Sequence, residues 1–417
     1  MASLDSKAAH FRPDIQGLRG IAVLLVLIYH TGFALPGGFV GVDMFFVISG
    51  FVITQVLIRE QQETGSISLL RFYARRAWRL VPALSVVMIF TLIVSIFVMS
   101  PFGDQQQIIK TAIASNFFAG NIHLFAMDSY EALKNNPLRH LWSLGVEEQF
   151  YWVFPVFVYF CFLSNATRFA RNLLIGSFLL AIVSFVLSVL LTYGYEFGYQ
   201  QGSKISDQLG FLTKIGFHPG GDWPAKFAFF GAPSRFWEIL LGSITAIFTN
   251  KFELKSRLLS IVFSLTGALL VLWASLKLNS VSAFPGYLAL APTLGTVFLI
   301  LFGRQFLPVQ KFLTHSKIVY VGDISYSLYL WHWPLIVFSK SIWPHSNLNL
   351  TLSVCLSFMC AIMSHKFIEI KSGEFRNFRS KRKLSFSILY IGFVLMVRNY
   401  LTRVAGLGVM PRDLQQF

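Results

Sequence analysis

Two residues that can do chemistry, Arg19 and His30, occupy the ends of the first apolar segment of the sequence. Eleven residues of α-helix rise about 16 Å, roughly half of a bilayer core, and complete almost three turns, so both side chains are expected on one face. Charged groups inside a membrane span are costly and usually functional. His30 is therefore a candidate general base or nucleophile. The alternative is an Arg that reaches the cytoplasmic interface and a His that caps the outer helix end.

A cluster of guanidinium groups, Arg75, Arg76 and Arg79, precedes the third apolar segment. Arg76 and Arg79 are three residues apart, and Arg75 lies within one turn of Arg79, so the side chains can share a helical face. Guanidinium groups bind phosphate in a bidentate manner, and the cluster predicts a site for a phosphorylated ligand. The alternative is that these arginines only mark a cytoplasmic loop, in which Lys and Arg accumulate by the positive-inside rule.

The segment 140–151 (HLWSLGVEEQFY) opens the fourth apolar stretch and carries a third group of polar residues. His140, Glu147 and Tyr151 recur at helical spacing and form one stripe, while Trp142 and Glu148 lie beside it. Carboxylates inside an apolar run need partners. Glu147 or Glu148 would orient an imidazole if the fold brings one near; the alternative is a structural ion pair with an Arg.

Weaker candidates lie on four further segments. Ser325, Tyr329 and His332 share one helical face, although their aromatic neighbours also suit an interfacial belt. His365 and Glu369 are spaced as a structural pair. Asp43 lies early in the second apolar stretch, and Arg235 and Glu238 most simply pair with each other. The residues that could touch the acceptor or support the site are these three together with His140, Trp142, Tyr151, Tyr329 and His332.

The composition indicates that membrane helices carry and position these residues. The chain has 417 residues, 55% hydrophobic and only 13% charged, which is typical of a polytopic membrane protein. We predict an all-α bundle of about eleven transmembrane helices. The apolar stretches are 16–34, 40–58, 80–100, 141–163, 172–193, 229–249, 257–276, 284–303, 319–340, 348–369 and 384–404.

The loops predict an orientation, because every second connection is basic, from 59–79 to 371–383. This pattern places the N-terminus in the cytoplasm and, after eleven spans, the C-terminus outside. The longer loops, 101–140 and 194–228, then lie on the outer face. Within the first, 108–127 is apolar enough for a re-entrant or interfacial helix.

The net charge of +16 has two candidate causes, retention of Lys and Arg on the cytoplasmic side and a polyanionic cytoplasmic ligand. Nucleic-acid binding is disfavoured, because the cations are scattered over short loops. The three cysteines lie in apolar runs and are expected to pack rather than form disulfides or bind metal. No metal site and no tightly bound cofactor is expected.

Six of these segments, in this order, resemble the signatures of the acyltransferase-3 family. The resemblance covers residues 12–334 and falls on matching spans. The segments are 13–20 (PDIQGLRG) continuing to His30, 41–51 (GVDMFFVISGF), Arg76 with Arg79, 142–151 (WSLGVEEQFY), 234–238 (SRFWE) and 325–334 (SYSLYLWHWP).

The resemblance implies a membrane domain of ten core spans over 12–370. It also implies that 371–417 hold a basic loop, an eleventh span and the start of a periplasmic linker. An eleventh span is typical of the subtype fused to a periplasmic SGNH-like domain, yet no Gly-Asp-Ser nucleophile block is present. We therefore expect the membrane half of such a protein, or a form that works with a separate partner. The stretch 367–371 (FIEIK) lacks the Pro that follows the Ile-Glu pair in many relatives.

The function implied is O-acylation, often acetylation, of an extracytoplasmic glycan such as O-antigen or another surface polysaccharide, in the bacterial inner membrane. Acyl-CoA would be the donor, with Arg19, Arg75, Arg76 and Arg79 on its phosphates or pantetheine arm. His30, supported by Glu147 or Glu148, would act as base or acyl acceptor. Expected partners are the donor, the glycan, membrane lipid and a possible SGNH-type domain. The alternative is a multi-pass transporter or flippase for a glycan or lipid-linked sugar.

Overall fold

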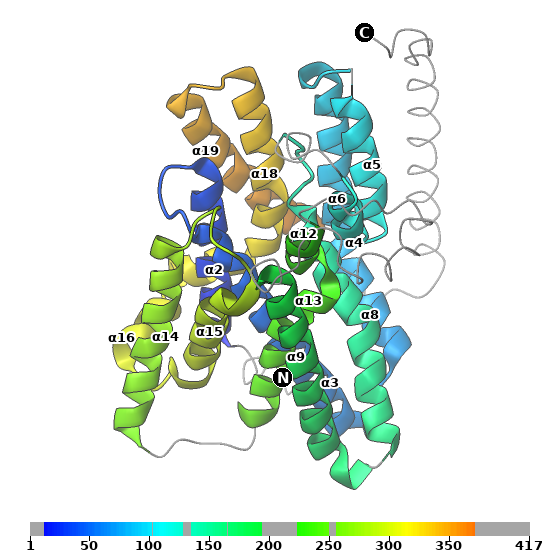
Figure 1. Cartoon of the computed structure of the whole chain (residues 1–417), viewed down its shortest axis with the longest axis vertical. Coiled ribbons are helices and arrows are strands. Elements are labelled where there is room, and N and C mark those ends of the chain that lie inside the picture. Colours follow the sequence, from blue (N-terminus) through cyan, green and yellow to red (C-terminus); the bar gives the residue numbers. More distant parts are fainter. Residues whose placement is uncertain are drawn as a thin grey trace.

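The computed structural model describes residues 12–101, 103–127, 135–164, 166–193, 223–249 and 256–371. All the regular secondary structure in these ranges is helical, and the longer helices run side by side along the long axis of the molecule (Figure 1). The all-α prediction is confirmed for this part of the chain.

Five helices in the described ranges are long and apolar enough to cross a membrane. A sixth candidate combines 286–302 with α16 (Leu307–Leu313), which meet at an angle of 103°. The count of eleven spans, the cytoplasmic N-terminus and the outer C-terminus stay predictions. The predicted eleventh span, 384–404, lies outside the described residues, as does the rest of the 372–417 segment.

Helix α2 (Pro13–Thr31) carries both Arg19 and His30 and lies among α3, α17 and α18 (Figure 1). Pro13 starts the helix, and Gly32 ends it in the left-handed conformation (φ 78°). The Gly17 and Gly20 of the signature segment have a packing role. A Cβ at either position would collide with a backbone carbonyl, of Leu313 and Ile318 respectively.

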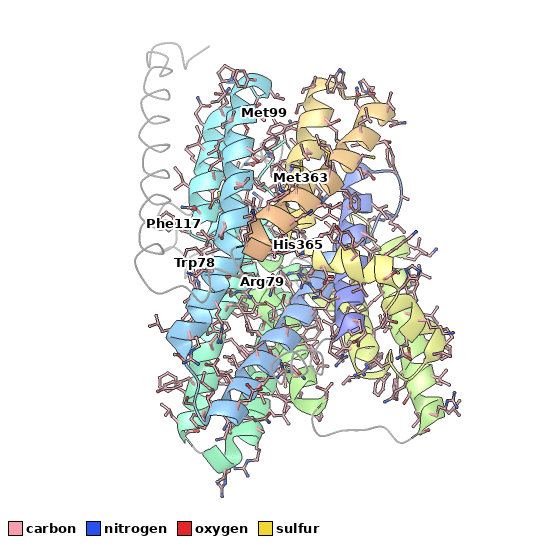
Figure 2. The ribbon with its side chains drawn as sticks, turned by 180° about the vertical axis from the view of Figure 1, so that it is seen from behind. Trp78, Arg79, Met99, Phe117, Met363 and His365 are labelled. Carbon is pink, nitrogen blue, oxygen red and sulfur yellow. The ribbon has the colours of Figure 1, made fainter. Side chains whose placement is uncertain are left out.

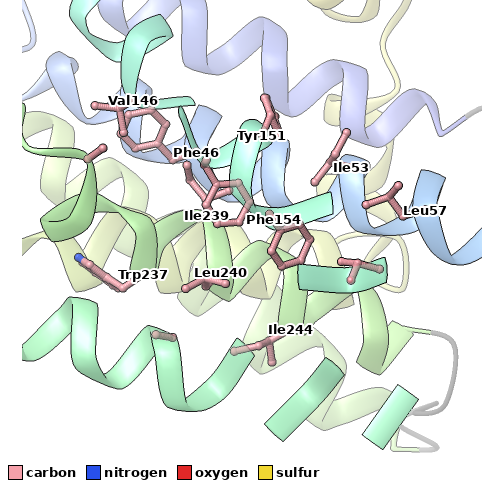
Figure 3. Close-up of a cluster of buried hydrophobic side chains, with 14 of the residues drawn as sticks. Phe46, Ile53, Leu57, Val146, Tyr151, Phe154, Trp237, Ile239, Leu240 and Ile244 are labelled. Carbon is pink, nitrogen blue, oxygen red and sulfur yellow. The ribbon is translucent and has the colours of Figure 1, made fainter. Parts of the chain in front are cut away.

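Helices α3 (Gly41–Thr64) and α13 (Ala232–Thr249) also approach at glycines. A Cβ at Gly50 would collide with the carbonyl of Ile239, and one at Gly242 with the carbonyl of Val47. With α8 (Leu141–Ser164) and α9 (Phe169–Tyr193), they enclose an apolar cluster that includes Phe46, Tyr151 and Trp237 (Figure 3). This cluster fixes α3 and α8, which carry Ser49 and Glu147, relative to each other.

The segment expected as one re-entrant or interfacial helix, 108–127, is divided between two helices. These are α5 (Asp104–Asn116) and α6 (Gly120–Phe125), separated by Phe118 at φ 54°. Asn121 joins α6 to the rest of the bundle, because its amide donates to the carbonyl of Phe230, 3.0 Å away. Helix α4 (Leu69–Val98) runs beside α5 (Figure 1), and α12 (Trp223–Phe230) lies against α6 and α9.

The predicted span 319–340 is also two helices, α17 (Ser316–Asp323) and α18 (Ser325–Ile342), separated at Ile324. The backbone leaves the helical region there (φ −87°, ψ 2°), and the break lets α17 pack on α2 while α18 runs on towards His30. The helices that complete the bundle are α14 (Arg257–Lys277), the short η3 (Gly286–Ala289), α15 (Leu290–Phe302), α19 (Asn347–Ser364) and the π-helical turn η4 (His365–Glu369).

Candidate active site

Two histidines meet where the C-terminal end of α2 passes the middle of α18. Nδ1 of His30 lies 2.9 Å from Nε2 of His332, and the two rings are stacked with centroids 5.2 Å apart. His332 is fully buried, whereas His30 is partly exposed. The sequence placed His332 among residues that might support the site, and the structure makes it the ring partner of His30.

The hydrogen bonds assign the tautomers of this pair. Nδ1 of His332 faces two backbone carbonyls, those of Leu328 at 3.1 Å and Tyr329 at 2.7 Å. A carbonyl only accepts, so this Nδ1 carries the proton, and in the neutral ring Nε2 is the acceptor. His30 then donates from Nδ1, which leaves the lone pair on Nε2 of His30 for a substrate proton or an acyl group.

Tyr329 and His140 border the histidine pair. The Tyr329 hydroxyl donates to the backbone carbonyl of His140 at 2.8 Å and shares a 2.6 Å hydrogen bond with the hydroxyl of Ser143. The rings of His140 and Tyr329 lie 5.6 and 5.5 Å from that of His332. These contacts connect the start of α8 to α18 and hold His332 in place.

The two glutamates of α8 lie on Arg76. The Arg76 guanidinium donates to Glu148 from Nε at 2.8 Å and to Glu147 from Nη2 at 3.2 Å. Its Cζ lies 3.4 Å from the centroid of the Tyr151 ring, and the Tyr151 and Ser49 hydroxyls donate to Glu147. The sequence analysis expected Glu147 or Glu148 to orient His30. In the structure His332 contacts His30, and the two glutamates orient Arg76 instead.

A cavity opens beside this network. It is lined by Arg19, Arg76 and Arg79, with the hydroxyls of Ser49, Tyr326 and Tyr329 among its other walls. Arg19 receives support from Gln16, whose amide oxygen accepts at 3.3 Å. Arg79 is exposed, and Figure 2 shows it where η4, with His365, passes α4. Arg76 and Arg79 follow Arg19 by 57 and 60 positions in the sequence, and the fold brings all three cations to one cavity.

Arg75 points elsewhere. Its guanidinium forms a 2.9 Å ion pair with Glu60 near the end of α3, and Arg71 approaches the same carboxylate at 4.0 Å. Arg75 is not among the residues that line the cavity. The structure therefore separates Arg75 from Arg76 and Arg79, the pair with which the sequence grouped it.

Asp43, Arg235 and Glu238 form a buried ion cluster between α3 and α13. Arg235 contacts Asp43 and Glu238 at 2.9 Å each, and its side chain is 1% exposed. The rings of Phe46, Trp142, Phe229 and Phe284 surround the guanidinium at 5.5–5.9 Å. The predicted Arg235–Glu238 pair is confirmed, and because the cluster is closed to solvent its role is to hold the cavity wall that Phe46 contributes.

The pair His365–Glu369 is also present, at 3.3 Å, and Ser327 of α18 donates to the same glutamate. Within the described residues, no group of His, Cys, Asp and Glu side chains is arranged to hold a metal ion. Cys161, Cys355 and Cys360 are free.

Several residues of the site were not singled out from the sequence as site residues. Ser49 and Ser143 contact Glu147 and Tyr329, and Tyr326 lines the cavity. Helical spacing was the available signal, because Ser143 lies one turn before Glu147 and Ser49 lies one turn after Phe45, which also lines the cavity.

The fold and site define a polytopic membrane protein with a histidine pair near a cavity that three arginines line. The chain matches the family described as "Acyltransferase domain", Acyl_transf_3, over residues 12–364. It therefore belongs to the acyltransferase-3 family, as the six sequence segments indicated, and its enzyme class is that of the acyltransferases.

The curated relatives include "O-acetyltransferase OatA" of Staphylococcus aureus strain MRSA252, 30% identical over 93% of this chain and 62% of the relative. "Putative O-acetyltransferase SAR0937" of the same strain is 30% identical over 98% of this chain and 65% of that protein. The chain thus spans less than two thirds of the length of these relatives. The comparison with solved structures found no match.

Proposed function

We propose that the protein is a membrane O-acetyltransferase that passes an acetyl group from cytoplasmic acetyl-CoA to a hydroxyl of an extracytoplasmic glycan. The observation that carries the proposal is the placement of a base and a cationic cavity on one helix: Arg19 and His30 share α2, about 16 Å apart along its axis. The names of the relatives support O-acetyl transfer as the reaction.

The donor would bind in the cavity. Acyl-CoA is a polyanion, and Arg19 and Arg79 would receive its phosphates or pantetheine arm. Arg76 is shared by two glutamates, so it contributes less free positive charge and acts mainly to shape the wall. The pantetheine arm would then extend along α2 towards His30.

The transfer step follows from the tautomers. Nε2 of His30 takes the proton of the acceptor hydroxyl while the hydroxyl oxygen attacks the carbonyl carbon of the thioester. The C–O bond forms, the C–S bond breaks, and the proton held by His30 goes to the CoA thiolate. The contact with His332 stabilises the positive charge that develops on His30, because Nε2 of His332 accepts from the Nδ1 proton.

Two variants of this path remain within the proposal. The acetyl group could pass to Nε2 of His30 first and then to the acceptor, or it could reach the glycan through the nucleophile of a periplasmic SGNH-type domain, on this or another chain. The bacterial cytoplasmic membrane is the proposed location.

The test uses the full chain in proteoliposomes with acetyl-labelled CoA on one side and a glycan acceptor on the other. The proposal expects label on the glycan and free CoA in equal amounts. Movement of unmodified glycan across the membrane, with no acetyl transfer, would support a transporter or flippase instead.

A further inference from the structure

Helix α18 begins at the cavity that Arg19 and Arg79 line. Its first residue, Ser325, lies in the wall of that cavity, and Tyr329 follows one turn further on. The N-terminal end of a helix carries partial positive charge and N–H groups that have no acceptor inside the helix. Within the described residues no side chain caps these groups at α18, since the preceding residue is Ile324. The cavity therefore meets a helix end that can receive an anion.

A close contact brings Arg19 near this helix end. Gly322, at the end of α17, packs against α2, and a Cβ there would collide with the backbone carbonyl of Gln16. The side-chain oxygen of Gln16 accepts a hydrogen bond from Arg19 at 3.3 Å. Ser325 follows Gly322 by three residues. The packing of α17 on α2 therefore places the first turn of α18 and Arg19 in the wall of one cavity.

The hydroxyl of Ser325 has no hydrogen-bond partner in the described part of the chain, although the side chain is 0% exposed. Ser and Thr inside helices can donate to the carbonyl four residues earlier, as Thr91 does to Val87 and Ser95 does to Thr91. Ser325 is the first residue of α18, so no carbonyl of its own helix precedes it. A buried polar group without a partner costs free energy, and in a cavity wall it points to a ligand that supplies the partner.

Other buried serines share the unpartnered hydroxyl but not the location. The hydroxyls of Ser177, Ser264 and Ser364 also lack partners among the described residues, and none of these three side chains lines the cavity. At Ser325 the unpartnered hydroxyl coincides with an uncapped helix N-terminus and with arginines in the same cavity wall. These features together define an anion site.

Neutral donors suit this position. Arg19 already interacts electrostatically with Glu147 and Glu369, which offset part of its charge. N–H and O–H groups need no counter-ion, and they give a bound anion directed hydrogen bonds. The hydroxyl of Ser325 and the amides of the first turn of α18 would fix the position of the anion, while Arg19 and Arg79 supply charge.

We propose that the first turn of α18, with the Ser325 hydroxyl, binds the diphosphate of acyl-CoA together with Arg19. The proposal rests on the proposed function and adds a binding residue to its donor site. The diphosphate is the phosphate group of coenzyme A nearest to the thioester, and the pantetheine arm joins the two. His332, which contacts His30, follows Ser325 by seven residues, about 10 Å of helix. One helix would thus hold the diphosphate at its start and orient the base two turns later.

The experiment measures the binding of three donors that differ in their anionic groups. These are acetyl-CoA, acetyl-dephospho-CoA, which lacks the 3′-phosphate, and acetyl-pantetheine, which lacks every phosphate. The full chain is used in vesicles of zwitterionic lipid, and the series is repeated in vesicles that contain phosphatidylglycerol. We expect Ser325→Ala to raise the Kd of both coenzyme forms about tenfold, because a hydrogen bond to a charged group is lost. The Kd of acetyl-pantetheine should not change.

Competition by inorganic diphosphate tests the same site without the pantetheine arm. It should displace acetyl-CoA from the wild type, and about tenfold more should be needed to displace it from Ser325→Ala at equal occupancy of the donor. Ser264→Ala is the matched control, because Ser264 is also buried with an unpartnered hydroxyl but lies on α14, outside the cavity wall. The control should keep the wild-type Kd for every donor.

Thermal unfolding separates binding from a structural role. Ser325→Ala removes a hydroxyl that has no partner in the free protein, so no hydrogen bond is lost and the thermal midpoint without donor should be at least that of the wild type. The rise of the midpoint on addition of acetyl-CoA should be smaller in the variant, because the donor binds less tightly. A midpoint lowered in the absence of donor would instead show that the hydroxyl stabilises the fold, and would overturn the inference.

An unchanged Kd for acetyl-CoA in Ser325→Ala would also overturn the inference. So would an equal increase for acetyl-pantetheine, since that result would place the hydroxyl on the pantetheine arm. An effect seen only with phosphatidylglycerol would assign the site to the phosphate of a lipid headgroup. These outcomes leave acetyl transfer intact, whereas absence of transfer from acetyl-CoA to any glycan would count against the proposed function.

Discussion

Nδ1 of His30 lies 2.9 Å from Nε2 of His332, although the two residues are 302 positions apart in the sequence. The backbone carbonyls of Leu328 and Tyr329 hold the other nitrogen of His332. His332 is therefore a positioning residue, which fixes the ring of His30 and the tautomer that exposes its basic nitrogen.

We predict that His332→Phe lowers kcat about 100-fold with little change in the KM for acyl-CoA, because the base loses its orienting acceptor while the donor cavity is untouched. His332→Gln, whose amide oxygen can accept from His30, should recover part of that loss. Steady-state kinetics over a range of pH check this. Equal loss in both variants, with an unchanged pH profile, would contradict a positioning role.

The cations of the cavity give a second prediction. Arg19→Gln and Arg79→Gln should each raise the Kd for acyl-CoA about tenfold, with the effect of the charge shrinking as salt rises. Arg71→Gln is the control, because Arg71 is exposed on the same helix as Arg79 and approaches Glu60. Binding is measured by equilibrium dialysis. If all three variants bind acyl-CoA as tightly as the wild type does, the donor does not bind in this cavity.

The Arg76–Glu148 contact predicts an effect on stability. The Glu148 side chain is 5% exposed and that of Arg76 is 17% exposed, so removing one partner leaves a buried charge without its counter-ion. Arg76→Met alone should cost about 3–5 kcal/mol, and the double variant Arg76→Met with Glu148→Leu should regain much of it. Thermal unfolding in detergent measures both. A double variant less stable than the single one would contradict this account.

Close backbone packing gives a fourth prediction. Gly50→Ala should lower the thermal midpoint by several degrees, because its Cβ meets the carbonyl of Ile239 on α13 and the two helices must separate. Val56→Ala, on an exposed part of the same helix, is the control. An unchanged midpoint in Gly50→Ala would show that the two helices are not in close contact there.

Much of the bundle could be predicted from the sequence, because apolar runs of sufficient length specify helices directly. Ten of the eleven predicted stretches have matching helices in the described residues. Apolar residues on both sides of Gly322 and Asp323 favour one continuous span over 319–340, whereas the break at Ile324 reflects how α17 packs on α2. The division of 108–127 at Phe118 likewise depends on a single backbone conformation.

The site was predicted in part. Helical spacing grouped Glu147 with Tyr151 and Arg76 with Arg79, and the structure keeps both groups. Helical spacing cannot predict contacts between residues on different helices. Nothing in the sequence connects Glu60 to Arg75, or decides that His332 rather than a glutamate meets His30.

The central claim is that His30 is the base that transfers the acyl group. The most direct measurement is acetyl transfer and acetyl-CoA binding by the same preparation of His30→Ala. We expect donor binding at the wild-type Kd, because Arg19 and Arg79 remain, and a loss of transfer of about 1,000-fold. Transfer by His30→Ala at the wild-type rate would contradict the account.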